Sequence, residues 1–478
     1  MRSASRVAVG LLLVSPYLIW LLWISKWEWP ATAEWLPVLT TASEQAAFSA
    51  AGSMIFGFCL FGAAQGWTSS RARGFAELAL LLPNMVPPLF LVLSLLSWVT
   101  PWAAFPYGLG AVVVAHVLLN SGLVAVSIDR LVQSQLSGLA ETAWTMGASR
   151  ATFWRQVAWP VLKSDLACIF LFIFSLCLTS FSIPLVLGGA RLATLEVAIF
   201  DFIRMEGRWD KAVILAALQS LLLLLLVWSL PHPFWPTQSA RRGLPYLAFK
   251  NWRLAVYLPA LILSLGWISG CGSIRRVLPA FDGSLSDALL TSLALGLTVG
   301  VLQLCLVLIV SYVLPHPPLN RFLNGYLAPS PAITGFAMLL LPGEGELFDF
   351  FKLAFALTLI SFPLLYRWIL HSALSGLQRQ ITVARTLGAD WSNILFEVVW
   401  PQIAPQALRA SGLAALWATG DFAISGIVAG QLQTVPLMMQ DYLANYRIEA
   451  AQLLMFPLLI VGAVLYGLFV GASRYVTR

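Results

Sequence analysis

Long apolar stretches recur along almost the whole chain and restrict what it can fold into. The protein has 478 residues, of which 59% are hydrophobic and 10% are charged, whereas average proteins carry about 25% charged residues. A helix of about 20 apolar residues is long enough to cross the hydrocarbon core of a bilayer. In lipid all backbone polar groups must be hydrogen-bonded within the protein, and these runs lack the alternation of barrel strands. The sequence therefore predicts an all-α integral membrane protein.

The apolar stretches predict about twelve transmembrane helices, six in each half of the chain. The first, from Val7 to Ser25, follows a short basic start and precedes no small-residue cleavage site. It is also too long for a signal-peptide core, so we interpret it as a retained span. The predicted spans lie at about 7–25, 44–66, 76–98, 107–127, 164–187, 212–230, 254–272, 288–314, 325–341, 350–370, 405–429 and 451–472.

The basic residues predict the orientation of these spans. With the N-terminus inside the cell, the cytoplasmic segments hold most of the 28 Lys and Arg residues, and the external loops collect acidic residues. This is the bias of membrane proteins toward positive cytoplasmic loops, so we expect both termini in the cytoplasm. The same bias accounts for the net charge of +7. A lipid bilayer, and no nucleic acid, is therefore the expected partner of this basic chain.

One short pattern occurs twice, at corresponding places in the two halves. The spacing from Gly147 to Pro160 equals the spacing from Gly388 to Pro401, and similar residues surround both pairs. Both copies lie in a predicted cytoplasmic loop between the fourth and fifth span of a half. The chain is therefore predicted to be a tandem duplication of one membrane module.

The duplication predicts a division of the sequence into three parts. Because each half has an even number of spans, both halves enter the membrane in the same direction, as parallel repeats do. A Pro-rich, basic segment separates them and is expected to be cytoplasmic. The predicted parts are a first transmembrane repeat at 1–230, a linker at 231–253 and a second transmembrane repeat at 254–478.

The two loops have the character of docking elements. A helix-forming stretch precedes each glycine, and the glycine then allows a turn or a close backbone approach. Aromatic or apolar residues follow, and Pro160 and Pro401 are expected to break the following stretch before the next span begins. A short helix with one apolar face can lie in the groove of a soluble partner. The alternative is an ordinary interfacial helix without a partner. Two equally spaced copies favour docking.

The arrangement resembles the signature loop of permease subunits of binding-protein-dependent ABC importers. In that family the pattern is Glu-Ala-Ala, three residues, Gly, nine residues, Ile, any residue, Leu-Pro. The matching residues are Glu141, Ala143, Gly147 and Pro160 in the first copy and Ala384, Gly388 and Pro401 in the second. Thr382 stands where the second copy would carry the acid. The resemblance implies that these residues form coupling loops that dock on separate ATPase subunits.

Further motifs are similar to those of thiamine importer permeases, which are fused, two-repeat subunits. They include Tyr107-Gly108-Leu109, Ala115-His116-Val117, Thr179-Ser180-Phe181 and Gly420-Asp421-Phe422. The resemblance implies a multi-pass subunit of the bacterial inner membrane that works with two copies of an ATPase and a periplasmic substrate-binding protein. The imported solute would be thiamine or its phosphates. Fused ferric-iron permeases share several of these motifs, so an iron permease is the alternative.

Two pairs of residues are candidate sites outside the loops. Asp421 is a charged residue inside a predicted span, and Ser180 is its counterpart in the first repeat. Charged residues in membrane spans are expensive, so we expect this pair to line the translocation pathway. The alternative is a carboxylate satisfied by backbone or hydroxyl donors. Asp201 and Asp441 lie in corresponding external segments and are expected to help dock the binding protein, the alternative being solvated loops without a partner.

The sequence shows no catalytic constellation. The five cysteines and four histidines have no metal-ligand spacing, and no Gly-rich loop is suited to nucleotide phosphates. We therefore expect no metal, no cofactor and no enzyme activity on this chain. An ion-coupled secondary transporter would also fit two parallel repeats, but it would more often carry several charged residues inside its spans.

Overall fold

The computed structural model describes most of the chain and is built of helices. It describes residues 2–23, 30–67, 69–100, 103–189, 192–228, 248, 250–271, 284–313, 330–428, 430, 432–445 and 447–476, and within these ranges no strand is present. The helices up to residue 228 are α1 (Arg2–Trp23), α2 (Thr32–Ala64), α3 (Ser70–Met85), α4 (Pro88–Val99), α5 (Leu109–Leu131), α6 (Ser137–Thr145), α7 (Arg150–Phe153), α8 (Trp159–Leu178), α9 (Ser182–Leu187), α10 (Leu195–Arg204) and α11 (Trp209–Trp228).

The second half of the sequence contributes a similar set of helices. They are α12 (Leu258–Cys271), α14 (Ser284–Val313), α16 (Pro331–Leu339), α17 (Glu346–Leu365), α18 (His371–Gly376), α19 (Gln378–Thr386), α20 (Trp391–Asn393), α21 (Trp400–Thr419), α22 (Ser425–Val428), α23 (Val435–Ala444) and α24 (Ile448–Val476). Four π-helical turns, η1 (Val132–Leu136), η2 (Trp154–Ala158), η7 (Tyr366–Leu370) and η8 (Ile394–Val399), and one 3₁₀ helix, η5 (Lys250–Tyr257), adjoin these α-helices.

Seven of the described helices are long and apolar enough to cross a membrane, and the number rises to eight if one bent pair is a single span. They are Glu34–Ala64, Leu109–Leu136, Arg150–Leu178, Trp209–Leu226, Ser284–Ser311, Glu346–Leu365 and Ile448–Tyr475. The all-α prediction agrees with the structure. The predicted count of about twelve spans is not confirmed, and the cytoplasmic placement of both termini stays a prediction.

Proline and chain turns explain part of the difference in span count. The predicted span at 76–98 is split into α3 and α4, which meet at 95°, because Pro87 and Pro88 lack backbone N–H donors and disfavour a helix before them. The predicted span at 405–429 ends at Thr419, where α21 stops and the chain turns before α22. Among the described residues, the predicted span at 325–341 contributes only the nine residues of α16.

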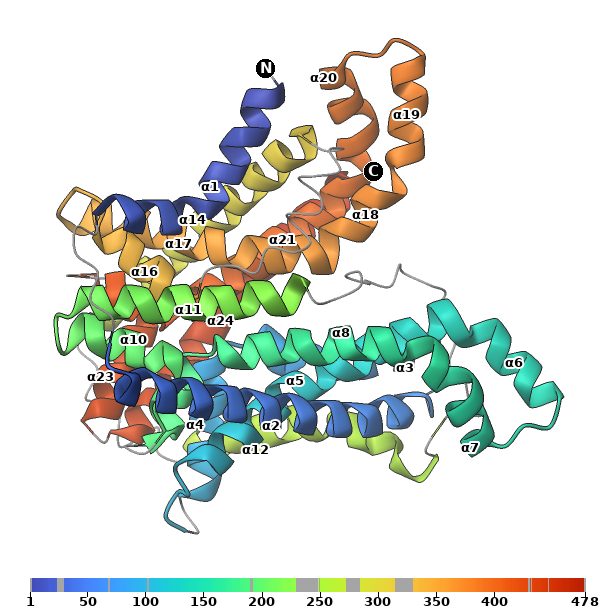
Figure 1. Ribbon diagram of the computed structural model, residues 1–478, viewed down its shortest axis with the longest axis horizontal. Helices are drawn as coiled ribbons and strands as arrows, with labels where there is room; N and C mark the ends of the chain where they lie inside the picture. Colours follow the sequence, from blue (N-terminus) through green and yellow to red (C-terminus); the bar gives the residue numbers. More distant parts are fainter. Residues whose placement is uncertain are drawn as a thin grey trace. The chain divides into compact units, whose positions relative to one another are not determined.

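The chain divides into two compact units, whose helices carry their labels in Figure 1. Unit 2 comprises Leu36–Thr194 and Leu226–Gly272. In it α12 packs on α4 and α3 packs on α5. A Cβ atom on Gly266 would lie 2.3 Å from the backbone oxygen of Ser94, and one on Gly122 would lie 1.7 Å from that of Leu80. These glycines therefore allow backbone-to-backbone packing, as small residues do between membrane helices.

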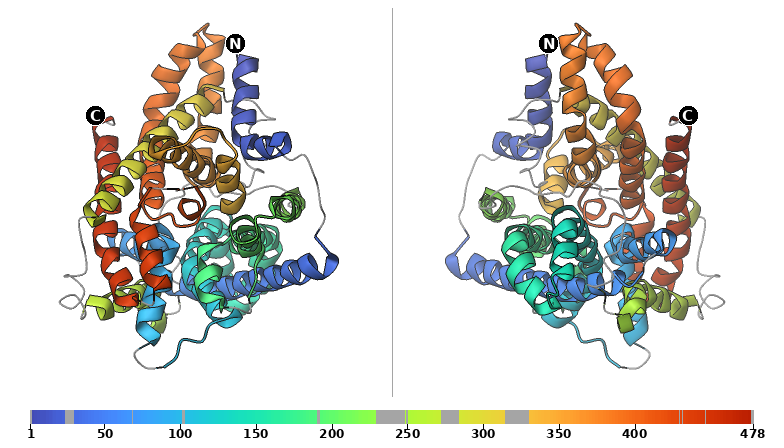
Figure 2. Two further views of the ribbon diagram at one scale, coloured as in Figure 1. Left: turned by 90° about the vertical axis from the view of Figure 1, so that its left-hand side faces the viewer. Right: turned by 90° about the vertical axis from the view of Figure 1, so that its right-hand side faces the viewer.

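Unit 1 comprises Met1–Trp35, Leu195–Leu225 and Ser273–Arg478. Its centre is formed by α14, α21 and α24, which pack against one another and can be followed from two sides in Figure 2. Gly296 and Gly300 of α14 face α21 and α24, where a Cβ atom would meet side chains at 2.6 Å. The amino-terminal α1 packs on α16 and α14, and α10 packs on α16.

The compact units cut across the predicted sequence halves. Helices α1, α10 and α11, from the predicted first repeat, belong largely to unit 1, whereas α12, from the predicted second repeat, belongs to unit 2. The division of the sequence at 1–230, 231–253 and 254–478 therefore stays a prediction about the repeat and does not describe packing. Most of the predicted linker lies outside the described residues, which resume continuously at Lys250.

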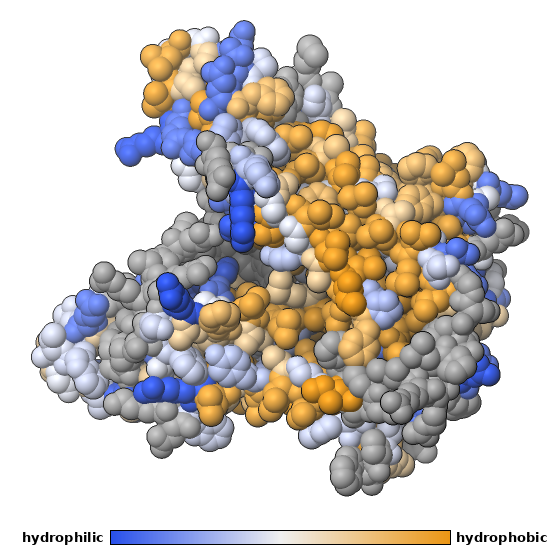
Figure 3. All heavy atoms as spheres, turned by 180° about the vertical axis from the view of Figure 1, so that it is seen from behind, coloured by the Kyte–Doolittle hydropathy of each residue, from blue (hydrophilic) through white to orange (hydrophobic). Residues whose placement is uncertain are grey.

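Apolar side chains dominate the outer surface of the long helices. Hydrophobic residues cover much of the face shown in Figure 3. On α24 the exposed fractions of Ile460, Val464 and Leu468 are 63%, 51% and 60%. Soluble proteins rarely expose apolar surface of this extent, so these side chains are suited to contact lipid.

Candidate functional site

The first duplicated loop is a helical hairpin closed by a left-handed glycine. Helix α6 ends in a turn in which Gly147 has φ +77°. The backbone N–H of Ala148 donates to the carbonyl of Ala143 at 3.0 Å, and that of Gly147 donates to the carbonyl of Trp144 at 3.0 Å. These two bonds are the Schellman pattern, which ends a helix and satisfies its last carbonyls. The chain then reverses direction into α7.

The second loop repeats this backbone geometry. Helix α19 has nine residues, as α6 does, and Gly388 after it has φ +84°. The N–H of Ala389 donates to the carbonyl of Ala384 at 3.1 Å, and that of Gly388 donates to the carbonyl of Arg385 at 3.1 Å. Both loops therefore use glycine for the same physical reason, since a left-handed conformation is costly for other residues.

The predicted loop residues divide into exposed and structural positions. Glu141 is exposed on α6, and its counterpart Thr382 is exposed on α19. The side chains of Ala143 and Ala384 are half-buried, and their carbonyls accept the hydrogen bonds that end the two helices. The acid that the sequence pattern singles out is therefore a surface group.

Pro160 and Pro401 do not break the chain, contrary to the expectation from sequence. Each is the second residue of a 20-residue helix, α8 or α21. A π-helical turn, η2 or η8, directly precedes each of these helices and continues the helical path. A π turn disrupts the regular hydrogen-bond ladder, and Pro has no N–H to contribute to that ladder. The two features therefore coexist without ending the helix.

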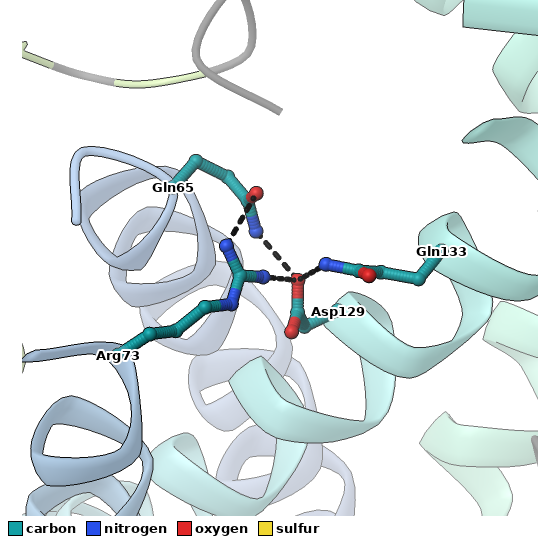
Figure 4. A network of polar contacts seen from close by, with 4 residues as sticks. All are labelled: Gln65, Arg73, Asp129 and Gln133. Carbon is teal, nitrogen blue, oxygen red and sulfur yellow. Dashed lines mark hydrogen bonds and ion pairs between the residues drawn. The ribbon is translucent and has the colours of Figure 1, made fainter. Parts of the chain in front are cut away.

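A buried polar cluster lies at the base of the first loop, in unit 2 (Figure 4). Asp129 Oδ1, near the end of α5, accepts from Arg73 Nη2 at 2.6 Å and from Gln65 Nε2 at 2.6 Å. Gln133 Nε2, in η1, donates to the same oxygen at 3.4 Å. The side chains of Arg73 and Asp129 are 7% and 24% exposed. The cluster thus joins the end of α2, the first turns of α3 and the turn that leads into α6.

A second contact joins the two ends of the same loop. Gln135 Nε2, in η1, donates to Asp165 Oδ2, in α8, at 2.9 Å. The entry into α6 and the helix that follows α7 are therefore tied together below the loop. Sequence reasoning did not identify these polar residues. The available signal was an acid near the carboxyl end of α5 and a base near the amino end of α3, both of which oppose the helix dipole and need a partner.

Asp421 acts as a cap in unit 1. Its Oδ2 atom accepts from the backbone N–H groups of Ile424 and Ser425 at 3.0 and 2.9 Å, and from Ser425 Oγ at 3.2 Å. These donors lie at the start of α22, so the carboxylate stabilises the turn after α21. Ser180 occupies the corresponding turn after α8, in unit 2, where it is half-buried.

The two external candidates lie on helices of equal length in unit 1. Asp201 belongs to α10 and Asp441 to α23, and each helix has ten residues. Asp441 is exposed and Asp201 is half-buried. Burial raises the pKa of Asp201 above its usual range, and the charge of Glu206 acts in the same direction.

Glu196 lies between two of the predicted spans, in an external segment of the predicted topology, but the structure buries it fully. Its Oε1 atom accepts from Gln219 Nε2 at 2.6 Å, and its Oε2 atom accepts from the backbone N–H of Ala332 at 3.3 Å. The carboxylate therefore joins α10 to α11 and to the amino end of α16. Burial raises the pKa of Glu196 to about 7, and hydrogen bonds from Gln219, Ser330 and Ala332 oppose the rise.

Comparison with known proteins gives a consistent result. The thiamine transport system permease protein of Haemophilus influenzae is 25% identical over 76% of this chain and 73% of its own length. That of Brucella suis biovar 1 is 25% identical over 90% of this chain and 86% of its own length. The chain resembles thiamine transport system permease proteins. The Escherichia coli protein of the same description is 24% identical over 76% of this chain.

This resemblance extends into both halves of the sequence, because every one of these matches covers more than half of the chain. A putative ferric transport system permease protein of Haemophilus influenzae is 32% identical, but over only 18% of this chain. No family model and no solved structure matches the chain. Together with the apolar helices, the resemblance identifies a multi-pass membrane protein similar to transport permeases.

Proposed function

We propose that the chain is the transmembrane permease subunit of an ATP-driven ABC importer, which moves thiamine or its phosphates from the periplasm to the cytoplasm across the bacterial inner membrane. The observation that carries the proposal is the pair of loops with the same backbone geometry at Gly147 and Gly388. The resemblance to thiamine transport system permease proteins supports the substrate.

In this proposal the chain hydrolyses nothing itself. Two copies of a separate ATPase subunit dock on the two loops, one on each, and a periplasmic binding protein delivers the solute to the outer face. ATP binding and hydrolysis shift the halves between outward-open and inward-open states. Ligands drive such a shift by binding the two states with different affinity.

The base of the first loop is built to transmit a displacement. The ion pair of Arg73 with Asp129 and the bond from Gln135 to Asp165 hold the loop to α3, α5 and α8. A movement of α6 would therefore shift these helices with it, because packed helices move as bodies and the loop ends are not free to bend.

The proposal also assigns roles to the predicted site residues outside the two loops. Asp201 and Asp441 would help dock the binding protein through α10 and α23, and charge reversal at both should weaken its association. The hydrogen bonds of Asp421 favour a structural role for this carboxylate. A lining role for Ser180 and Asp421 in the pathway stays a prediction that the substitution of Asp421 by Asn tests.

The deciding experiment is uptake of labelled thiamine into proteoliposomes that hold this chain, its ATPase and its binding protein, with ferric iron measured in parallel. ATP-dependent uptake of thiamine alone is the expected result. ATP-dependent uptake of iron alone would support the proposed coupling to ATP but contradict thiamine as the substrate. The short match to a ferric permease makes this control worth including. Movement of either solute without ATP would identify an ion-coupled secondary transporter and contradict the proposal.

A further inference from the structure

One large apolar side chain stands at the tip of each loop. Met146 is 81% exposed and Leu387 is 80% exposed. Each directly precedes the left-handed glycine, so the two residues occupy the same position in two turns of the same geometry. In Figure 1 the helices that they directly follow, α6 in unit 2 and α19 in unit 1, project beyond the ends of the long helices that precede them.

Most exposed side chains around these two residues are polar, although Trp144 and Val383 are exposed apolar neighbours. The exposed polar neighbours in the first loop are Glu141, Thr142, Thr145, Ser149 and Arg150, and those in the second are Arg379, Gln380, Thr382, Arg385 and Asp390. A surface inside the hydrocarbon would exclude so many charged groups. Highly exposed apolar residues on a mostly polar, protruding surface are typical anchors of a protein interface, where a few buried side chains carry most of the binding energy.

The charged residues of the two loops are arranged in opposite order. In the first loop the charged residue of α6 is acidic and those of α7 and η2 are basic. In the second loop α19 carries basic residues, whereas the cap of α20 and η8 carry acidic ones. The exposed charges, in chain order, are Glu141, Arg150 and Arg155, then Arg379, Arg385, Asp390 and Glu397.

The backbone geometry and the apolar residue at the tip are shared, whereas the charges are reversed. Two copies of the same partner present the same groove with the same charged rim. Such a rim can be complementary to one loop but not to both, so the shared affinity must come from the shared features.

We propose that Met146 and Leu387 are apolar anchors that insert into the same groove on two copies of one ATPase subunit, and that the reversed charges make the two contacts unequal. This inference rests on the proposed function. It adds the residues that bind and the difference between the two docking sites. Salt should then weaken one contact and strengthen the other, since screening reduces attraction in one and repulsion in the other.

The anchors are tested by binding of the purified ATPase subunit to the full chain in detergent. Met146→Ala and Leu387→Ala should each weaken binding at their own loop about tenfold, and the double variant should lose binding. Thr145→Ala and Thr386→Ala are matched controls, because these exposed threonines are the immediate neighbours of the anchors in the two loops. The controls should bind as the unaltered protein does.

The charges are tested in the two single-anchor variants. Leu387→Ala leaves the first loop as the main contact, and Met146→Ala leaves the second. Raising the salt from about 0.05 M to about 0.3 M, which shortens the screening length by roughly 2.4-fold, should move the two affinities in opposite directions. Adding Glu141→Lys to the Leu387→Ala variant should shift the salt response of the first loop toward that of the second. Equal salt responses would overturn the proposed inequality.

The outcomes separate this inference from the proposed function. If the unaltered chain does not bind or stimulate the ATPase, the proposed function fails. If it binds the ATPase and transports, but the anchor variants behave like the threonine controls, the assignment of Met146 and Leu387 as anchors is wrong and the proposed function stands. A spin label on a cysteine at position 146 or 387 tests the remaining possibility, that the loop tips contact a lipid surface instead of a protein. A signal from lipid burial in nanodiscs without the ATPase would overturn docking on a protein groove.

Discussion

Gly147 and Gly388 hold a backbone conformation that other residues adopt only at a cost. Their φ angles are +77° and +84°, and no heavy atom lies within 4 Å of the place where a Cβ atom would stand. The requirement for glycine is therefore conformational and not one of space. A left-handed conformation costs an ordinary residue roughly 1–2 kcal/mol, and asparagine less.

The effect of a substitution at either glycine should consequently depend on how readily the new residue adopts a left-handed conformation. Gly147→Val or Gly388→Val should distort the turn and reduce thiamine uptake for each ATP hydrolysed, whereas Gly147→Asn should retain most coupling. The ratio of uptake to hydrolysis in proteoliposomes measures this effect. Equal coupling in the valine and asparagine variants would contradict the role of the left-handed turn.

The carboxylate of Asp421 makes contacts that an amide can largely reproduce. Asp421→Asn keeps an oxygen for the N–H groups of Ile424 and Ser425, so uptake should stay close to that of the unaltered protein. Asp421→Ala loses the cap and should destabilise the protein by about 1 kcal/mol, seen as a lower thermal midpoint. Loss of uptake in the asparagine variant, with the midpoint unchanged, would instead support a role in the translocation pathway.

At the scale of elements, two ion pairs join α3 to α5 but differ in burial. Arg73 and Asp129 are 7% and 24% exposed, whereas Arg130 and Glu77 are 42% and 29% exposed. Removing one partner of a buried pair leaves an uncompensated charge, at a cost of about 3–5 kcal/mol. An exposed pair contributes about 0–1 kcal/mol.

Asp129→Asn should therefore lower the thermal midpoint far more than Glu77→Gln does. The double variant Arg73→Gln, Asp129→Asn should be less destabilised than the sum of the two single variants, because it leaves no unpaired charge. Thermal unfolding in detergent checks both statements. A similar midpoint for Asp129→Asn and Glu77→Gln would show that the cluster does not fix the base of the loop.

Glu196 joins three helices, and its burial leads us to expect that the stability of the protein depends on pH. Its pKa rises from the ordinary value of 4.5 to about 7, so between these values the folded protein binds more protons than the unfolded chain. Stability from this group is present below pH 4.5 and is lost as the pH rises toward 7. Glu196→Gln should flatten the fall of the thermal midpoint over this range, and Glu344→Gln, an exposed control, should not.

Features that depend on residues close together in the sequence could be predicted from it. Features that depend on the packing of separate helices could not. The glycine turns of the two loops were expected, because their residues act within a few positions of one another. The continuous helix through Pro160 was not, because a π turn has no clear sequence signal. The cluster at Asp129 joins side chains from separate helices, and no local pattern reports such a contact.

At the scale of the whole molecule, packing departs from sequence order. Helix α12 packs on α3 and α4, which belong to the other predicted repeat, and α1 packs on α16 and α14. Sequence periodicity places the repeats but says nothing about which helix covers which neighbour in lipid, since apolar faces of membrane helices are chemically alike. The repeat boundaries and the compact units are therefore different properties of the same chain.

All the functional assignments depend on the predicted orientation of the chain in the membrane. The positive-inside bias predicts that both termini and the two loops lie in the cytoplasm, where ATP is available. In a variant without native cysteines, Glu206→Cys should react with a membrane-impermeant maleimide in intact spheroplasts. Tyr475→Cys, at an exposed position near the end of α24, should react only after permeabilisation. The opposite pattern would place the loops outside, and the coupling proposal would then fail whatever solute the chain carries.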